Sequence, residues 1–321
     1  MRKTTFHNRP AVCIENEFVR LTVMERGGHI AELLDKRTGV SPLWVPPWAD
    51  EPSPDFGNNA ETRLLDGIFG HNLCLDLFGP PSDAEAACGV VAHAEGGVEP
   101  YRFEACEAGL IARCTLRSSQ LEFTRAIRLN GRRALIEEAV ENLSVFDRPI
   151  AWTQHVTLGP PFLERGRTEF RIPATKSRAI GETEDFDWPG PRKLNTFTNE
   201  ESSAGYTAHL MNPAQPQSYF IAWSPTAQVA CAYVWERADF PWLGIWEENH
   251  SRPHSPWNGR TLTRGMEFGV SPFPETRRQM IERGTLFGAP CYRWIDARGR
   301  LTVRYYAAIA PASQLPALTD L

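Results

Sequence analysis

The sequence predicts an all-β protein, a large antiparallel β-sandwich with few short helices. Apolar and polar residues alternate with a period of two along much of the 321-residue chain. Its 26 prolines and 24 glycines fall mainly between the alternating runs, where they mark turns. Helical segments do not separate successive strands, so the pattern favours stacked antiparallel sheets over a βαβ protein. No break in composition marks a boundary, and we expect one domain over residues 1–321.

The predicted strands are rich in β-branched and aromatic residues. Six runs alternate clearly, namely 18–24, 110–117, 121–129, 219–224, 229–235 and 301–309. Residues 133–143 fit either a helix or a strand by pattern. Because they follow Gly131 and Arg132 directly behind the 121–129 run, we predict the second arm of a hairpin.

Helices are expected at only two places. Residues 274–284 form the clearest candidate, with Pro274 near the start and Gly284 past the end. Short helices are also expected around residues 60–70. The stretches 41–62 and 176–205 are predicted to be irregular, and such long loops usually form the rim of a binding face or ordered excursions.

Composition narrows the class of partner and the compartment. The formal net charge is −5 and the pI is about 6.0, which argues against nucleic acid or an anionic membrane as the main partner. No apolar run approaches the ~20 residues that span a bilayer, and the first ten residues lack the apolar core of a secretory signal. Seven scattered cysteines without a CxxC pair indicate reduced, mostly buried thiols. We expect a cytoplasmic protein.

Residues 242–275 are the most informative stretch for function. They hold Trp242, Trp246 and Trp257, two histidines and the glutamates Glu247, Glu248 and Glu267 around a Pro/Gly-rich loop. Aromatic faces beside carboxylates and imidazoles suit a sugar, which shows apolar C–H faces and polar hydroxyl edges. We interpret 242–262 as an aromatic loop that shapes the ligand and 263–273 as a strand.

Glu267 is the first candidate catalytic residue. It stands between Met266 and Phe268, so on a strand it faces away from the apolar side. A carboxylate flanked by apolar residues is costly to bury unless it has partners or a task. The alternative is an ordinary glutamate on a solvated face.

Two histidines are the next candidates. His155 lies on the second strand of a predicted strand pair that closes around Phe146–Pro149, and an imidazole suits proton transfer near neutral pH. His93 is predicted to end an apolar strand before a Gly-Gly turn. For each, the alternative is a histidine without a catalytic role, half-buried at His155 and on the surface at His93.

The remaining histidines are weaker candidates. His29 follows the Gly27–Gly28 turn and is predicted to be structural, and His71 has no clear role. His250 and His254 have a spacing that allows a metal pair if Glu247 or Glu248 joins them, but no helix fixes that geometry. The chain contains no P-loop, GxGxxG, GxSxG, HExxH or zinc-cysteine cluster, so a nucleotide-binding protein, a serine hydrolase and a zinc peptidase lose their usual support.

Four motifs in order resemble a known family. They are the Gly27–Gly28 turn with Ile30, His93 before a Gly-rich turn, the segment 142–155 with its asparagine, serine, proline and terminal histidine, and the glutamate strand around Glu267. Over roughly residues 18–310 this order is similar to the galactose mutarotase (aldose 1-epimerase) superfamily, whose members form a large antiparallel β-supersandwich.

The resemblance implies interconversion of sugar anomers by general acid–base chemistry, which needs neither a metal nor an organic cofactor. It assigns Glu267 as the base on the C1 hydroxyl, His155 as the proton donor to the ring oxygen, and His93 as a hydrogen-bonding contact to the sugar. The family's asparagine–arginine pair is not evident, and Arg63 is the expected substitute. The usual glycine after the family's histidine is Ala94 here, which suggests a divergent branch.

Further substrate contacts are inferred from residue type alone. Trp246 or Trp257 is expected to supply a stacking face, and Glu247 is a further candidate for substrate binding. The expected partner is a small-molecule sugar, without nucleic acid or membrane, and the sequence does not predict the oligomeric state.

Other function classes on the same scaffold stay open. One is a non-catalytic sugar-binding or sensing protein. Another is a lyase or glycoside hydrolase, which needs a tyrosine base or a second carboxylate such as Glu247 or Glu248. A sugar-phosphate epimerase needs an arginine cluster, for which Arg252, Arg260 and Arg264 are available.

Overall fold

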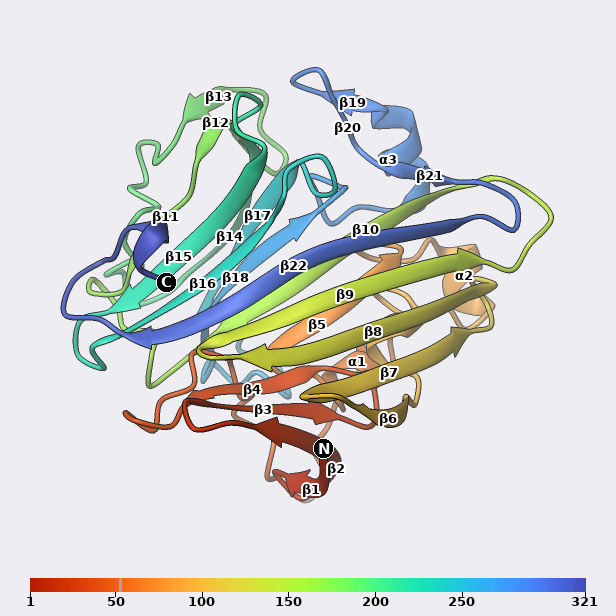
Figure 1. Cartoon of the computed structure of the whole chain (residues 1–321). Helices are drawn as coiled ribbons and strands as arrows, with labels where there is room; N and C mark the ends of the chain where they lie inside the picture. The colour runs from red at the N-terminus through yellow and green to blue at the C-terminus, as the bar shows by residue number, and fades with distance from the viewer. Residues whose placement is uncertain (52–53) are drawn as a thin grey trace.

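The computed structural model describes residues 1–51 and 54–321, and its strands form two large antiparallel sheets (Figure 1). The twelve-stranded sheet has, in spatial order, β1 (Arg2–Phe6), β2 (Arg9–Glu15), β3 (Val19–Met24), β4 (Ile30–Asp35), β5 (His71–Asp76), β10 (Arg148–Leu158), β18 (Leu262–Gly269), β17 (Trp242–Asn249), β14 (Ser203–Met211), β12 (Ala174–Ala179) and β13 (Asp185–Asp187), with β21 (Arg293–Ile295) paired to β10.

The eight-stranded sheet lies against it. Its order is β11 (Glu169–Arg171), β15 (Gln217–Ser224), β16 (Val229–Glu236), β22 (Arg300–Pro311), β9 (Arg133–Asn142), β8 (Leu121–Asn130), β7 (Gly109–Leu116) and β6 (Arg102–Cys106). A small ribbon is formed by β19 (Thr285–Leu286) and β20 (Ala289–Pro290). The predicted all-β fold class is confirmed.

The helical segments are short. They are α1 (Thr62–Leu65), α2 (Asp83–Ala87), α3 (Arg277–Arg283) and the 3-10 turns η1 (Glu95–Gly97) and η2 (Leu318–Asp320). Thr276 caps α3 with its side chain, so the predicted helix begins three residues after Pro274 and ends before Gly284. Among the described residues no helix is long and apolar enough to cross a membrane.

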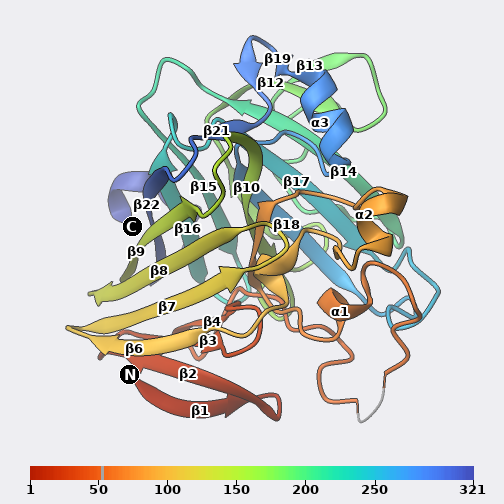
Figure 2. The same cartoon turned by 90° about the vertical axis from the view of Figure 1, so that its right-hand side faces the viewer.

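The main core lies between the two sheets, because side chains alternate between the two faces of each strand. One buried cluster joins residues from Val12 in β2 to Ile309 in β22 and draws on both sheets. In Figure 2, α1 and α2 lie on the side of the twelve-stranded sheet that faces away from the eight-stranded sheet. All seven cysteines are free thiols and five of them are buried, as predicted.

Four local expectations are corrected by the structure. Residues 242–249 form β17 rather than a loop, because the aromatic and β-branched side chains pack in a central strand. The run ending at His93 is a loop, whose apolar residues are buried against α1 rather than in a sheet. β9 and β10 belong to different sheets, so Phe146–Pro149 is a crossover and not a hairpin. The stretch 176–205 contains β13 and the ends of β12 and β14.

The other irregular stretch is largely as predicted. Residues 41–51 and 54–61 form no regular element, and they run beside the outer face of the twelve-stranded sheet. Pro52 and Ser53 lie outside the described residues. Trp44 and Trp48 anchor this stretch by packing on Trp257 with ring centroids 6.3 and 5.0 Å away.

Candidate functional site

A row of residues on adjacent strands forms the centre of the site. His155 in β10 is paired with Asn72 in β5 on one side and with Glu267 in β18 on the other. The neighbours Met266 and Phe268 belong to the core between the sheets. Alternation therefore places the side chains of His155 and Glu267 on the outer face, as the sequence predicted for Glu267.

His155 and Glu267 are in direct contact. The Nε2 atom of His155 lies 2.9 Å from Oε1 of Glu267, and the side chains are only 9% and 2% exposed. The contact has an ion-pair distance, yet Oε1 has no partner with hydrogen-bond geometry. The N–H bond at Nε2 therefore does not point at this oxygen. The other ring nitrogen, Nδ1, lies 3.0 Å from the hydroxyl of Thr157.

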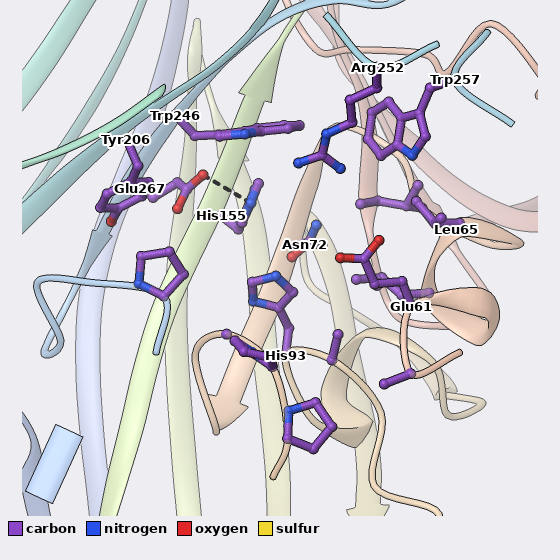
Figure 3. Close-up of a pocket in the computed structure, with 18 residues that line it drawn as sticks. Glu61, Leu65, Asn72, His93, His155, Tyr206, Trp246, Arg252, Trp257 and Glu267 are labelled. Carbon is purple, nitrogen blue, oxygen red and sulfur yellow. Dashed lines mark ion pairs between the residues drawn. The ribbon is translucent and has the colours of Figure 1, made fainter. Parts of the chain in front are cut away.

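Both side chains line a cavity of about 280 Å³, just below the usual range for small-molecule sites. Figure 3 shows its central residues. The floor is polar, with Asn72 projecting from β5, His155 from β10, Glu267 from β18 and Tyr206 from β14, which is separated from β18 by β17. The walls are largely apolar and come from α1, from β17 and from loops, with lining residues Ala60, Leu64, Leu65, Ile68, Pro80, Pro81, Ala92, Trp246, Trp257 and Pro274.

Two glycines give the polar floor its depth. A Cβ atom at Gly265 would lie 2.4 Å from Oε1 of Glu267, and one at Gly244 would lie 1.8 Å from the hydroxyl of Tyr206. Any side chain at either position would displace these polar groups. The strands thus provide space where the carboxylate and the phenol approach the sheet surface.

Tyr206 is a polar group of the site that sequence reasoning missed. Its hydroxyl is buried and has no hydrogen-bond partner among the described residues. Burial and the nearby charge of Glu267 raise the pKa of Tyr206 well above its ordinary value. Tyr206 therefore keeps its proton and is a hydrogen-bond donor rather than a base.

His93 lies next to His155, with the ring centroids 5.6 Å apart. Its Nδ1 atom is 3.3 Å from the thiol of Cys74. Burial, followed by the proximity of His155, lowers the pKa of His93 to about 3. His93 is therefore neutral at physiological pH. Its backbone has φ 60°, and Ala94 follows with φ 62°, a region that non-glycine residues rarely adopt.

Arg252 is the arginine of the cavity. Its Nε atom lies 3.2 Å from Oε2 of the buried Glu248, and its guanidinium lies 4.5 Å from the ring centroid of Trp257. Figure 3 shows the guanidinium hanging over the cavity beside Trp246. The sequence contains a pattern that points to Arg252 as a residue of the cavity, namely two tryptophans close to a basic residue. Arginine stacks well on indole rings.

The predicted tryptophans both line the cavity. Trp246 in β17 lies 5.8 Å from the ring of His155, and Trp257 closes the wall beside Leu65. Arg63 and Glu247 do not line it. Arg63 pairs with Glu99 at 2.8 Å, and Glu247 points to the other face of β17, where it pairs with the buried Arg264.

The remaining polar candidates also have other partners. Glu248 accepts hydrogen bonds from the backbone and hydroxyl of Ser251, so it organises the loop. Nδ1 of His250 lies 2.6 Å from the carbonyl of Gly259, which leaves that nitrogen a donor and no metal ligand. Among the described residues no three histidines, cysteines or carboxylates are grouped to hold a metal ion. Arg260 pairs with Glu51, outside the cavity.

Comparison with known proteins identifies the architecture. No family model matches the sequence, and no curated protein matches it. Among solved structures, a Klebsiella pneumoniae protein provisionally named as an aldose 1-epimerase is 14% identical, with 95% of this chain and 80% of that chain covered and a TM-score of 0.71.

Two further structures are called galactose mutarotase-like proteins. The one from Clostridium acetobutylicum is 13% identical, with 97% and 98% of the two chains covered and a TM-score of 0.67. The one from Lactobacillus casei is 15% identical, with 94% and 100% covered and a TM-score of 0.64. At such low identity these likenesses establish the fold alone, and the chain therefore has the galactose mutarotase-like fold.

Proposed function

We propose that this protein interconverts the anomers of a monosaccharide by general acid–base catalysis, as an aldose 1-epimerase does. The observation that carries the proposal is the contact of 2.9 Å between the imidazole of His155 and the carboxylate of Glu267 on the floor of the cavity. An acid and a base side by side are what opening a cyclic hemiacetal requires.

In the proposed reaction, the carboxylate of Glu267 takes the proton of the C1 hydroxyl while Nε2–H of His155 protonates the ring oxygen. The bond between C1 and the ring oxygen breaks, and an aldehyde forms at C1. Rotation about the C1–C2 bond presents the other face of the aldehyde. Ring closure then runs with the roles reversed, so that Glu267 and His155 regain their starting protonation states.

The direction of the Nε2–H bond supports His155 as the donor. Because this bond does not point at Glu267 and has no other hydrogen-bond partner among the described residues, it is available to a ligand. The same arrangement leaves the carboxylate of Glu267 short of donors. A sugar that presents a hydroxyl and a ring oxygen would satisfy both groups.

The other cavity residues are proposed to hold the sugar. Trp246 and Trp257 offer flat apolar faces for the C–H side of the ring. Neutral His93 and the guanidinium of Arg252 are placed to bond hydroxyl groups. The reaction needs no metal or organic cofactor, because both proton transfers use side chains of the chain itself.

Polarimetry on freshly dissolved α-glucose, α-galactose and a broader aldose panel tests the proposal. We expect acceleration by the wild type and loss of acceleration in Glu267→Gln, with Glu137→Gln on the other sheet as a control. No acceleration of any aldose by the wild type would contradict the epimerase activity. If sugar binding measured by calorimetry then survived Glu267→Gln, the protein would be a non-catalytic sugar binder.

A further inference from the structure

Thr157 is the only hydrogen-bond partner of the Nδ1 atom of His155 among the described residues. It lies two residues further along β10 and so projects from the same face. Its Oγ1 atom is 3.0 Å from Nδ1, the residue is buried, and the described part of the chain offers this hydroxyl no second partner. The proposed function assigns Nε2 to proton transfer and leaves the role of Nδ1 open.

The chemistry sets a requirement at Nδ1. When His155 acts as an acid, both ring nitrogens carry a proton and Nε2 gives one away. The neutral ring that remains must keep its proton on Nδ1, so that Nε2 can take a proton back when the sugar closes. An acceptor at Nδ1 is therefore needed before and after the transfer, and a threonine oxygen can accept in both states.

We propose that Thr157 is a positioning residue that accepts a hydrogen bond from Nδ1–H of His155, so that Nε2 alone exchanges a proton with the sugar. The proposal rests on the proposed function of His155. To that role of His155 the proposal adds a defined tautomer and a defined ring orientation, both set by the hydroxyl of Thr157.

The backbone holds this hydroxyl in place. The amide of Thr157 donates to the carbonyl of Gly70 at 3.0 Å, and its carbonyl accepts from the amide of Trp44 at 2.9 Å. A β-branched side chain on a strand has few rotamers. The hydroxyl therefore stays at one position relative to the imidazole without a further anchor.

Substitution at Thr157 leaves the other groups around His155 unchanged. Among the described residues, the titratable and charged groups that line the cavity with His155 are Glu267 from β18, Tyr206 from β14, His93 from the loop before η1, Glu61 beside α1 and Arg252 from the loop after β17. The buried His29 and His71 also lie within electrostatic range of it. None of them bonds the hydroxyl of Thr157. A change of pH profile in a Thr157 variant therefore reports the hydroxyl itself.

The kinetic test compares Thr157→Val, which keeps the shape, with Thr157→Ser, which keeps the hydroxyl. We expect Thr157→Val to lower kcat about 10²-fold, at the lower end of a general acid–base contribution, with KM little changed. Without an acceptor the imidazolium is less stable, so the alkaline limb of the pH profile moves to lower pH. Thr157→Ser should restore both.

Thr153→Val is the matched control. Thr153 lies on the same face of β10, two residues before His155, and its buried hydroxyl has no hydrogen-bond partner in the described part of the chain. Its replacement should leave the activity and the pH profile as in the wild type. An equal loss of activity in both valine variants would overturn the proposal, because it would reflect general packing of the strand.

Nuclear magnetic resonance separates this proposal from the proposed function. With ¹⁵N-labelled histidine, and with His155 assigned through His155→Gln, we expect a proton on Nδ1 of protonated His155 that is protected from solvent exchange. The protection should disappear in Thr157→Val and return in Thr157→Ser. Rapid exchange at Nδ1 in the wild type would overturn the proposal even if the protein is an active epimerase. Protection in a protein without epimerase activity would remove only the proposed function.

Discussion

The two faces of β10 carry buried polar groups of opposite character. On the inner face, Gln154 joins a network around Glu138, which accepts hydrogen bonds from Arg125 at 2.7 Å, Gln154 at 2.6 Å, Trp152 at 3.1 Å and Tyr305 at 2.7 Å. One residue further along the strand, on the outer face, His155 touches Glu267. There Oε1 of Glu267 has no hydrogen-bond partner in the described residues.

This contrast separates scaffold from site. When a buried charge has a complete set of partners, their hydrogen bonds offset the free-energy cost of removing the charge from water. The resulting network holds the sheets together. A buried carboxylate and a buried phenol that lack hydrogen-bond partners lower the stability of the folded protein. Such groups are typical of binding sites, where a ligand supplies the missing hydrogen bonds. The inner network thus fixes β10, and the outer pair leaves hydrogen-bonding capacity for a ligand.

The largest expected effect is on activity at the outer face. Glu267→Gln keeps the shape and removes the base, so we expect kcat/KM for mutarotation to fall about 10³-fold, within the range for acid–base catalysis. The free energy of unfolding, measured in urea, should change by less than about 1 kcal/mol, because the lost carboxylate is incompletely bonded. A large loss of stability would place Glu267 in the scaffold instead.

The inner face should respond in the opposite way. Glu138→Ala leaves the guanidinium of Arg125 buried without its counter-charge, and both side chains are at most 1% exposed. Breaking such a pair costs about 3–5 kcal/mol in the free energy of unfolding. Activity per folded molecule should stay near that of the wild type. Double replacement with Arg125→Met should recover part of the loss, and failure to do so would refute an uncompensated charge as the cause.

Acid is expected to weaken both faces, because each contains a neutral buried histidine. Burial lowers the pKa of His71 on the inner face well below its ordinary value and that of His93 in the site to about 3. The unfolded chain takes up protons near pH 6.5. The stability that these neutral histidines contribute is therefore present above pH 6.5 and is lost as the pH falls from 6.5 toward 3.

At pH 5 this loss amounts to about 2 kcal/mol for each buried histidine. Urea unfolding at pH 7 and pH 5 measures it. A neutral substitute such as His71→Gln should reduce the difference between the two pH values by a similar amount. An unchanged difference in that variant would mean that His71 does not contribute to the acid sensitivity.

Alternation along the sequence predicts the direction of a side chain on a strand, but it does not predict all the residues that line the cavity. Alternation around Glu267 correctly gave its outward direction, because the period of two is a local property. The Pro/Gly-rich surroundings of residues 242–249 predict a loop, in which alternation says nothing about direction. Glu247 and Trp246 therefore look equivalent in the sequence, although they face opposite sides of β17. Tyr206 and Asn72 were missed for another reason: their place in the cavity depends on the order of strands in the sheet, which is a non-local property.

The loop at His93 shows the same limit in another form. Its apolar residues resemble a buried strand, because burial selects apolar residues whatever the backbone conformation. Here Val91 is buried in a cluster with α1 and three tryptophans, and no sheet is involved. The sequence does indicate the unusual backbone at Ala94, because the family that the chain resembles has glycine at this position.

Ala94 offers the smallest and most local test. Its φ of 62° and ψ of −169° lie in a region that is essentially restricted to glycine. Ala94→Gly should relieve strain of about 1–3 kcal/mol and add roughly 1 kcal/mol of chain entropy to the unfolded state. We expect a net gain of about 1 kcal/mol in the free energy of unfolding.

Ala92→Gly is the control, because Ala92 is equally buried in the same loop and its φ is not positive. It should lose about 1 kcal/mol for the entropy and the missing methyl group. Since His93 is held by this strained turn, Ala94→Gly should also raise KM for the sugar while kcat stays similar. Equal destabilisation by both substitutions would mean that the turn is not strained, and that the position of His93 is set by its packing against Phe78, Cys74 and His155.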